Sequence, residues 1–229
     1  MMDSDEHRED RLRQMTCQLG QMLRPDGDTT LFMGDTCATV AVYGPGEVKM
    51  NKELLDKATV EVVYRSKSGL PGCAEKMIER LICNTYQTAI LTQLHPRSSV
   101  SLTIQEIQNS GSFLACCINA SCLALLDASV SMKFLVAAVS CIIDNDGNIV
   151  LDPNRKQEKT ARSSLTFVFD NKDKKIVTIN AKGDYRIEEL NRCLALCKEA
   201  SVAIFDFYRE SMKKKLSKSM NTLKGDPES

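Results

Sequence analysis

Hydrophobic and polar residues alternate in several short stretches of the first half of the chain, and this pattern predicts β-strands. The stretches lie within residues 15–23, 29–33, 36–43, 58–64 and 100–107. Proline, glycine and aspartate, which favour turns, separate the first of them. The first half is therefore expected to form a meander of strands.

Other segments carry hydrophobic residues every three or four positions, which is typical of helices. Such helices are expected at about 78–89, at 113–130, and from Ile187 into the basic stretch 213–218. The second of these is apolar on nearly all sides, so it should be buried at the centre of the molecule. The lysines of 213–218 either end a solvated helix or form a nuclear address or a nucleic-acid contact.

The second half adds further strands to this plan. Residues 134–143 and 148–151 are expected to form a hairpin across the Asp-Gly turn at 144–147, and strands follow at 163–169 and 175–181. A buried helix packed against such strands indicates an α/β protein with mixed sheets.

Composition along the chain indicates where the domain begins and ends, and it excludes some kinds of binding. The chain has 229 residues, 43% of them hydrophobic, with 30 basic and 30 acidic side chains. Residues 1–11 are expected to be a flexible polar leader, 12–218 one domain, and 219–229 a disordered tail. Zero net charge excludes binding of nucleic acid by overall attraction, so any such binding needs a local patch. No stretch approaches the roughly 18 apolar residues of a membrane span, and no membrane association is expected.

The cysteines and histidines give no indication of a common catalytic or metal site. The ten cysteines fall mainly within apolar segments without a C-x-x-C pair, so they predict core packing and no metal site. The chain has two histidines, and only His95 lies within the domain. Nothing near His95 indicates a catalytic triad.

The turn at Gly111 and Ser112 is the most informative local feature. It follows a strand and precedes the apolar helix, whose free N–H groups and dipole favour an anion. Phe113 and Leu114 follow directly, where a phosphate-binding enzyme needs a cation. The turn therefore resembles a phosphate cradle that has lost its charge.

Several strings in this order, taken together, resemble the RNase PH family. They include residues 24–27, 34–46, 69–82, 111–117 and 151–159, and the resemblance covers about 12–218. Within the family the chain is most similar to the RNase PH-like subunits of the eukaryotic RNA exosome ring, in particular to the smallest of them. The resemblance implies a βαβα fold related to the ribosomal protein S5 domain 2-like fold, assembled into dimers and hexameric rings.

Active members of the family cleave RNA with inorganic phosphate, and the resemblance implies where their site would lie. Gln87 would replace one phosphate-binding arginine, and Gly111, Ser112 and Phe113 would replace the phosphate loop. Asp152 and Glu158 would remain of the family's acidic set and could hold Mg²⁺. No other cofactor is expected.

Basic residues remain on the segment that faces RNA in the family. These are Arg65, Lys67, Lys76, Arg80 and Arg97. They either contact a nucleic-acid backbone or are ordinary solvated charges, partly offset by nearby glutamates.

The favoured interpretation is a non-catalytic, RNA-binding exosome subunit in the nucleus, nucleolus and cytoplasm. Its partners would be other RNase PH-like subunits, RNA and a separate catalytic nuclease. Two alternatives remain open. One is metal-dependent hydrolysis of RNA or DNA through Asp152 and Glu158. The other is a self-associated homodimer that acts as an adaptor for another nuclease.

Overall fold

The structure is a computed structural model that describes residues 12–224. The predicted leader at 1–11 and the last five residues of the predicted tail lie outside the described residues. Among the described helices, none is long and apolar enough to cross a membrane.

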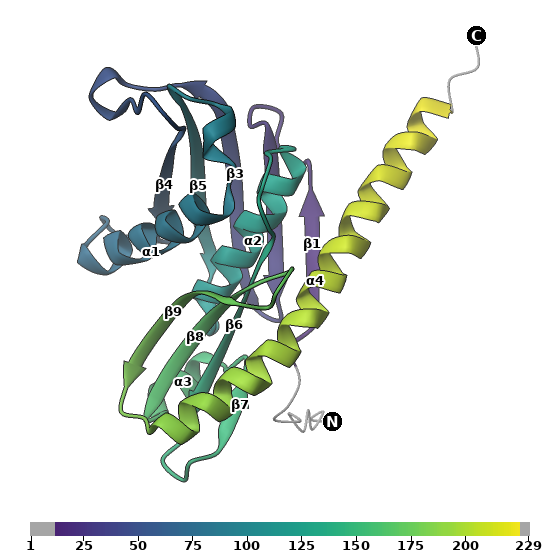
Figure 1. Cartoon of the computed structure of the whole chain (residues 1–229). Coiled ribbons are helices and arrows are strands. Elements are labelled where there is room, and N and C mark those ends of the chain that lie inside the picture. Colours follow the sequence, from purple (N-terminus) through teal and green to yellow (C-terminus); the bar gives the residue numbers. More distant parts are fainter. Residues whose placement is uncertain (1–11, 225–229) are drawn as a thin grey trace.

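Two sheets form the framework (Figure 1). The first has the order β1-β2-β3-β5-β4, and its strands are β1 (Met15–Leu19), β2 (Gly27–Met33), β3 (Thr36–Glu47), β4 (Thr59–Arg65) and β5 (Ser98–Gln108). The second has the order β7-β6-β8-β9, and its strands are β6 (Val136–Ile143), β7 (Ile149–Leu151), β8 (Ser163–Asp170) and β9 (Ile176–Gly183). All neighbours are antiparallel except β4 and β5. The predicted α/β class with mixed sheets is confirmed.

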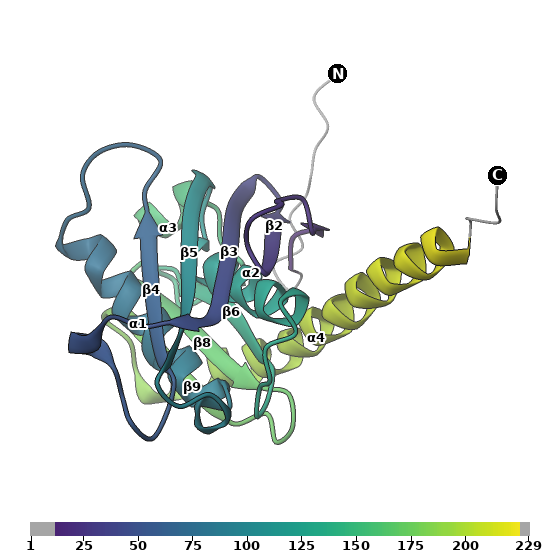
Figure 2. The same ribbon diagram turned by 90° about the horizontal axis from the view of Figure 1, so that it is seen from above.

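The helices fill the space between and beside the sheets. They are α1 (Cys73–Ala89), α2 (Phe113–Asp127), α3 (Arg155–Thr160) and α4 (Ile187–Lys224), with short 3₁₀ turns at Met50–Lys52 and Thr92–Leu94. Helix α2 lies between the two sheets, and α1 packs on β4 (Figure 1). Helix α4 packs on β6, passes β1 and then projects beyond the body of the molecule (Figure 2).

Two predicted helix ends were wrong, and one helix was not predicted. Helix α2 ends at Asp127 instead of continuing to 130. Helix α4 continues to Lys224, so the expected disordered tail does not begin at 219. Helix α3 was not predicted at all, although Asn154 and Gln157 form a capping box at its start, which is a recognisable helix signal.

Helix α2 is buried because its surface is apolar on nearly every side and because the first sheet approaches it closely. Gly27 in β2 lies directly against the end of the helix. A Cβ atom at this position would lie 2.3 Å from the backbone nitrogen of Ala128 and 2.6 Å from the carbonyl oxygen of Ala124. Only glycine permits this approach.

A buried amide, Asn119 of α2, joins three elements. Its Nδ2 donates to the carbonyl oxygen of Ala138 in β6 at 2.9 Å, and its Oδ1 accepts from the N–H of Ala138 at 2.8 Å. The hydroxyl of Tyr208 in α4 donates to the same Oδ1 at 2.9 Å. Strand β7 pairs only with Cys141, Ile142 and Ile143 of β6, so the amide takes the place of a neighbouring strand where β7 no longer reaches.

Asn119→Leu is expected to lower the free energy of unfolding by about 3–5 kcal/mol, because it leaves two buried backbone groups of Ala138 without partners. Tyr208→Phe, the matched control, removes one hydroxyl and keeps the amide, so a loss of about 1 kcal/mol is expected. Urea denaturation measures both values. Equal losses for the two variants would contradict the strand-replacing role of Asn119.

Candidate functional site

A cleft with a volume of about 380 Å³ lies where α1, the start of α2, α3 and the second sheet meet. Polar groups from the sheet and apolar groups from α1 line it. Its residues are Tyr64, Ala74, Met77, Ile78, Leu81, Asn109, Ser112, Phe113, Leu114, Ser140, Glu158, Ser164, Thr166, Asn180 and Lys182. The structure thus brings Ser112, Phe113 and Glu158 together in one cleft.

The N-terminus of α2 already holds an anion, and that anion belongs to the chain itself. The backbone N–H of Ser112 donates to Oε1 of Glu158 at 2.7 Å. A helix N-terminus favours negative charge through its free N–H groups and its dipole. Glu158 therefore occupies the position in which a phosphate would accept the same hydrogen bond.

Close packing of α3 against the Gly111 turn brings Glu158 to this position. A Cβ atom on Gly111, whose φ is +112°, would lie 2.3 Å from the carbonyl oxygen of Pro153. The N–H of Arg155 donates to the carbonyl oxygen of Ser110 at 2.9 Å, and the hydroxyl of Ser112 donates to that of Pro153 at 3.2 Å. Glycine at 111 thus permits the contact that carries Glu158 to the helix.

Phe113 is part of the core beneath the cleft. Its ring centroid lies 5.8 Å from that of Tyr64, and both side chains are buried. The hydroxyl of Tyr64 donates to Glu106, and burial together with this carboxylate raises the pKa of Tyr64 above its ordinary value. Tyr64 is therefore a core residue and presents no face for stacking on a base. Phe113 brings no cation to the turn.

The structure does not place Asp152 as a free metal ligand. Its side chain is buried and ion-paired with Arg13, whose Nη2 lies 2.7 Å from Oδ1 and whose Nε donates to Oδ2 at 2.9 Å. Burial opposes the charge of Arg13, but the hydrogen bonds and charge of Asp152 outweigh it, so the pKa of Arg13 is raised. No pattern in the sequence indicated this role of Arg13.

Asp152 and Glu158, the pair that could hold Mg²⁺ under the nuclease alternative, therefore each have a partner within the chain. Within residues 12–224, no three histidine, cysteine, aspartate or glutamate side chains are grouped so that they could hold a metal ion.

The expected position of Gln87 was also wrong. Ala74, Met77, Ile78 and Leu81 give α1 one face on the cleft, and Gln87 lies on another face of the helix. It is exposed, its amide donates to Sγ of Cys83 at 3.4 Å, and it borders a separate cavity of about 280 Å³. The residues of α1 that line the cleft recur every three or four positions, so the next residues on the same face of the helix are 84 and 85.

The five predicted nucleic-acid contacts are all exposed, but they differ in their surroundings. Lys76 Nζ lies 2.6 Å from Oε2 of Glu79, and Arg97 Nε lies 3.6 Å from Oε1 of Glu53. Arg65 ends β4, Lys67 follows it in the loop, and Arg80 borders a shallow groove on α1. These last three form no ion pair with another described residue.

Two family models match the chain. The first, the 3′ exoribonuclease family, domain 1, matches residues 11–131, and the second, domain 2 of the same family, matches residues 135–200. The chain belongs to the RNase PH family.

Curated RNase PH relatives agree with this assignment. The Arabidopsis thaliana protein named "Exosome complex exonuclease RRP46 homolog" is 31% identical over 224 residues, which cover 90% of this chain and 94% of that protein. The Caenorhabditis elegans "Exosome complex component RRP46 homolog" is 31% identical over 210 residues, covering 90% of this chain and 97% of its own.

Solved RNase PH structures show the same fold. The crystal structure of rice (Oryza sativa) Rrp46 has a TM-score of 0.87 and 32% identity, and the match covers 92% of this chain and all of that chain. The Archaeoglobus fulgidus exosome with RNA bound has a TM-score of 0.75 at 17% identity, so its likeness is one of fold alone.

Arg13→Met is expected to lower the free energy of unfolding by about 3–5 kcal/mol, because Asp152 would remain buried and charged without its partner. Lys175→Met is the control, because the Lys175–Asp173 pair is exposed to solvent and its loss should change the free energy of unfolding far less than the loss of Arg13. Guanidinium chloride denaturation compares the two. A small effect at Arg13 would mean that Asp152 does not depend on this pair.

Glu158→Ala is expected to lower the free energy of unfolding by about 1 kcal/mol, because the start of α2 loses its bound carboxylate. Glu199→Ala, on the exposed side of α4, should change it by less than about 0.5 kcal/mol. Urea denaturation of both variants tests this. Identical curves would show that Glu158 does not stabilise α2.

Proposed function

We propose that this RNase PH-family chain is a non-catalytic subunit of an RNA exosome ring. Its similarity to RRP46 homologues over most of both chains supports membership of such a ring. The filled N-terminus of α2 supports the absence of catalysis. Phosphorolysis requires inorganic phosphate beside cations and hydrogen-bond donors.

The hydrogen bond from Ser112 to Glu158 is the observation that carries this proposal. Phosphate would have to displace a covalently attached carboxylate from the helix N-terminus. The phosphate would then meet Phe113, which offers no positive charge. Hydrolysis through a metal is disfavoured for a related reason, because Asp152 is already paired with Arg13.

The role left to the chain is to shape the ring and to contact RNA at its surface. Arg65, Lys67 and Arg80 would bind backbone phosphates, and this contact would be sensitive to salt and insensitive to sequence. The partners would be other exosome subunits and a separate nuclease that degrades the RNA. No cofactor is needed for this role, and its place would be the nucleus, nucleolus and cytoplasm.

The test incubates the purified chain with end-labelled single-stranded RNA or DNA, with and without phosphate, and with Mg²⁺ or a chelator. No cleavage is expected in any arm. Release of nucleoside diphosphates in phosphate would overturn the proposal, and so would cleavage that requires Mg²⁺. Tighter binding of RNA than of DNA would indicate contact with the 2′-hydroxyl, which phosphate contacts alone do not detect.

A double variant, Arg65→Glu with Lys67→Glu, is expected to weaken RNA binding and to reduce its salt dependence. Two lost phosphate contacts should lower the slope of log K against log salt by about 1.4. Fluorescence anisotropy of labelled oligouridylate at several salt concentrations measures the slope. Arg97→Glu is the matched control, because Arg97 already faces Glu53 and should change the slope little. Equal effects of both variants would reject Arg65 and Lys67 as the RNA contact.

A further inference from the structure

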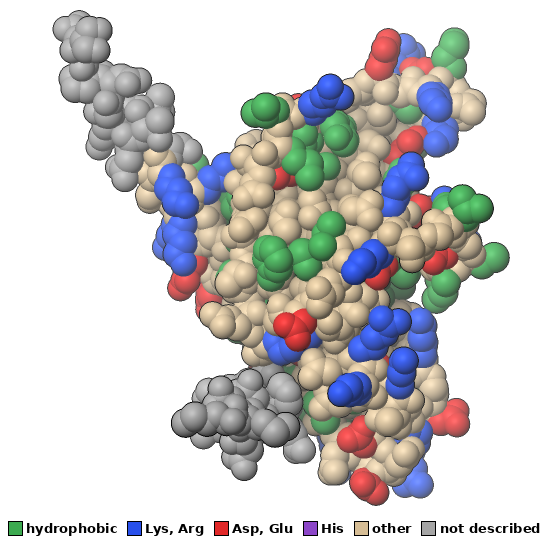
Figure 3. All heavy atoms as spheres, turned by 180° about the vertical axis from the view of Figure 1, so that it is seen from behind, with side chains coloured by type: hydrophobic (Ala, Val, Ile, Leu, Met, Phe, Trp, Pro, Cys, Tyr) green, Lys and Arg blue, Asp and Glu red, His purple; other side chains and the backbone are tan. Residues whose placement is uncertain are grey.

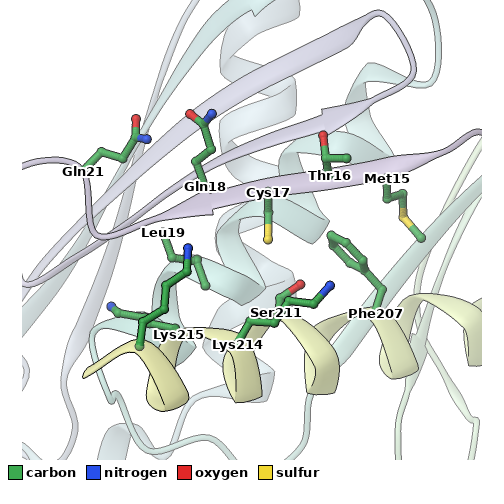
Figure 4. A pocket seen from close by; sticks show the side chains of 11 residues that line it. Met15, Thr16, Cys17, Gln18, Leu19, Gln21, Phe207, Ser211, Lys214 and Lys215 are labelled. Carbon is green, nitrogen blue, oxygen red and sulfur yellow. The ribbon is translucent and has the colours of Figure 1, made fainter. Parts of the chain in front are cut away.

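A groove of about 400 Å³ separates strand β1 from helix α4 (Figure 4), and it shares no lining residue with the cleft. Strand and helix run side by side there, with the side chains of Cys17 and Leu19 directed toward the helix. Its lining residues are Met15, Thr16, Cys17, Gln18, Leu19, Gln21, Phe207, Ser211, Lys214, Lys215 and Lys218.

Strand β1 is the edge of its sheet, and no strand formed by the described residues lies on the outer side of its backbone. The N–H of Gly34 donates to the carbonyl oxygen of Gln14 at 3.0 Å, and that of Gly20 donates to Asp28 at 3.4 Å. Hydrogen-bonded pairs alternate in an antiparallel ladder, so Thr16 and Gln18 also direct their backbone groups to β2.

The backbone N–H and C=O groups of Met15, Cys17 and Leu19 therefore point away from the sheet. No hydrogen bond from these groups to another described residue is present. An edge of this kind is a template for pairing with another extended chain.

The opposite side of the groove carries positive charge. Three lysines line it and no carboxylate does, although the whole chain has zero net charge. Lys215 bonds to Asp127 of α2, and Lys214 is exposed. The space-filling view from behind shows basic side chains gathered on the projecting part of α4, beside the hydrophobic side chains that lie over the outer face of the first sheet (Figure 3).

The spacing of the lysines matches an extended chain. Lys214 and Lys218 are four residues apart, which is about 6 Å along the axis of a helix. Alternate side chains of a strand are separated by about 7 Å. A strand beside β1 would therefore bring alternate side chains close to both lysines.

We propose that this groove binds an extended acidic segment of another protein, which adds to β1 as a further strand. Its backbone would pair with Met15, Cys17 and Leu19, and its alternate aspartate or glutamate side chains would face Lys214 and Lys218. The ladder of donors and acceptors selects a peptide over RNA, because a phosphate backbone offers acceptors but no N–H donors. Addition of a strand to a free sheet edge is an established mode of peptide recognition. The interaction is independent of RNA binding and of the cleft.

The probe is a fluorescein-labelled peptide of nine residues that alternates glutamate with threonine. Fluorescence anisotropy measures its binding to the full chain, and hydrogen exchange is followed residue by residue by NMR. The expected result is binding that slows the exchange of the Met15, Cys17 and Leu19 N–H groups. Exchange at Thr16 and Gln18, which already bond to β2, should change little.

Lys214→Glu is expected to weaken binding of this peptide about tenfold. Lys213→Glu is the matched control, because Lys213 is also exposed on α4 but does not line the groove, and it should change binding less than twofold. A peptide with glutamine in place of glutamate should bind as weakly as the glutamate peptide binds to Lys214→Glu.

Four results would overturn the proposal. They are no binding at millimolar peptide, binding without protection of the three alternating N–H groups, equal weakening by Lys213→Glu, and displacement of the peptide by oligouridylate at the concentration at which RNA binds. Self-association that protects the same N–H groups without peptide would assign the edge to a second copy instead. The RNA titrations with Arg65 and Lys67 variants are unaffected by any of these outcomes.

Discussion

The arrangement of the molecule depends on the complete burial of α2 between two sheets. A helix that is apolar on nearly all sides stabilises the fold only if other elements cover every side. The first sheet does so through the close approach at Gly27, and the second does so through β6. Tyr208 of α4 adds a hydrogen bond to Asn119 of α2. Asn119 makes the second contact specific, because its amide satisfies the backbone of Ala138 on the side of β6 that β7 does not reach. A buried amide is unfavourable if it lacks hydrogen bonds. Because the Asn119 amide is hydrogen-bonded, it instead fixes the relative positions of α2, β6 and α4.

The fixed position of α2 also determines which groups meet in the cleft. Because α2 is fixed, its N-terminus opens at one place, beside the Gly111 turn. The close contact of this turn with Pro153 and Arg155 sets the start of α3, and α3 brings Glu158 to the free N–H of Ser112. The start of α2, which favours an anion, thereby forms a contact within the chain. Asp152, a few residues earlier, is fixed in the same way by Arg13. The acidic groups that suggested chemistry in the sequence instead hold the connections between elements.

Much of the fold followed from local patterns, since alternation and helical spacing report directly on which face of an element is buried. Strands β3, β5 and β6 and helices α1, α2 and α4 were all predicted near their observed places. The partners of Asp152 and Glu158 could not be predicted, because Arg13 is 139 residues away from Asp152 and Ser112 is 46 residues away from Glu158. Gln87 was misplaced for a different reason. The resemblance placed it by its position along the sequence. Which face of α1 lines the cleft follows instead from the spacing of the residues of α1 that reach the cleft.

Polar and charged groups in the cleft differ from those at the edges of the molecule in whether the fold supplies their hydrogen-bond or ion-pair partners. In the cleft, Asp152 and Glu158 are matched by Arg13 and by the start of α2, so they have little capacity left to bind a phosphate or a metal. At the edge of β1, backbone donors and acceptors that have no partner within residues 12–224 lie opposite lysines, and near the end of β4 cationic side chains form no ion pair with a described carboxylate. Binding energy comes from groups whose partners are not already supplied by the fold. A chain with this distribution is suited to hold other macromolecules at its edges, while the contact between the start of α2 and Glu158 serves the stability of the fold.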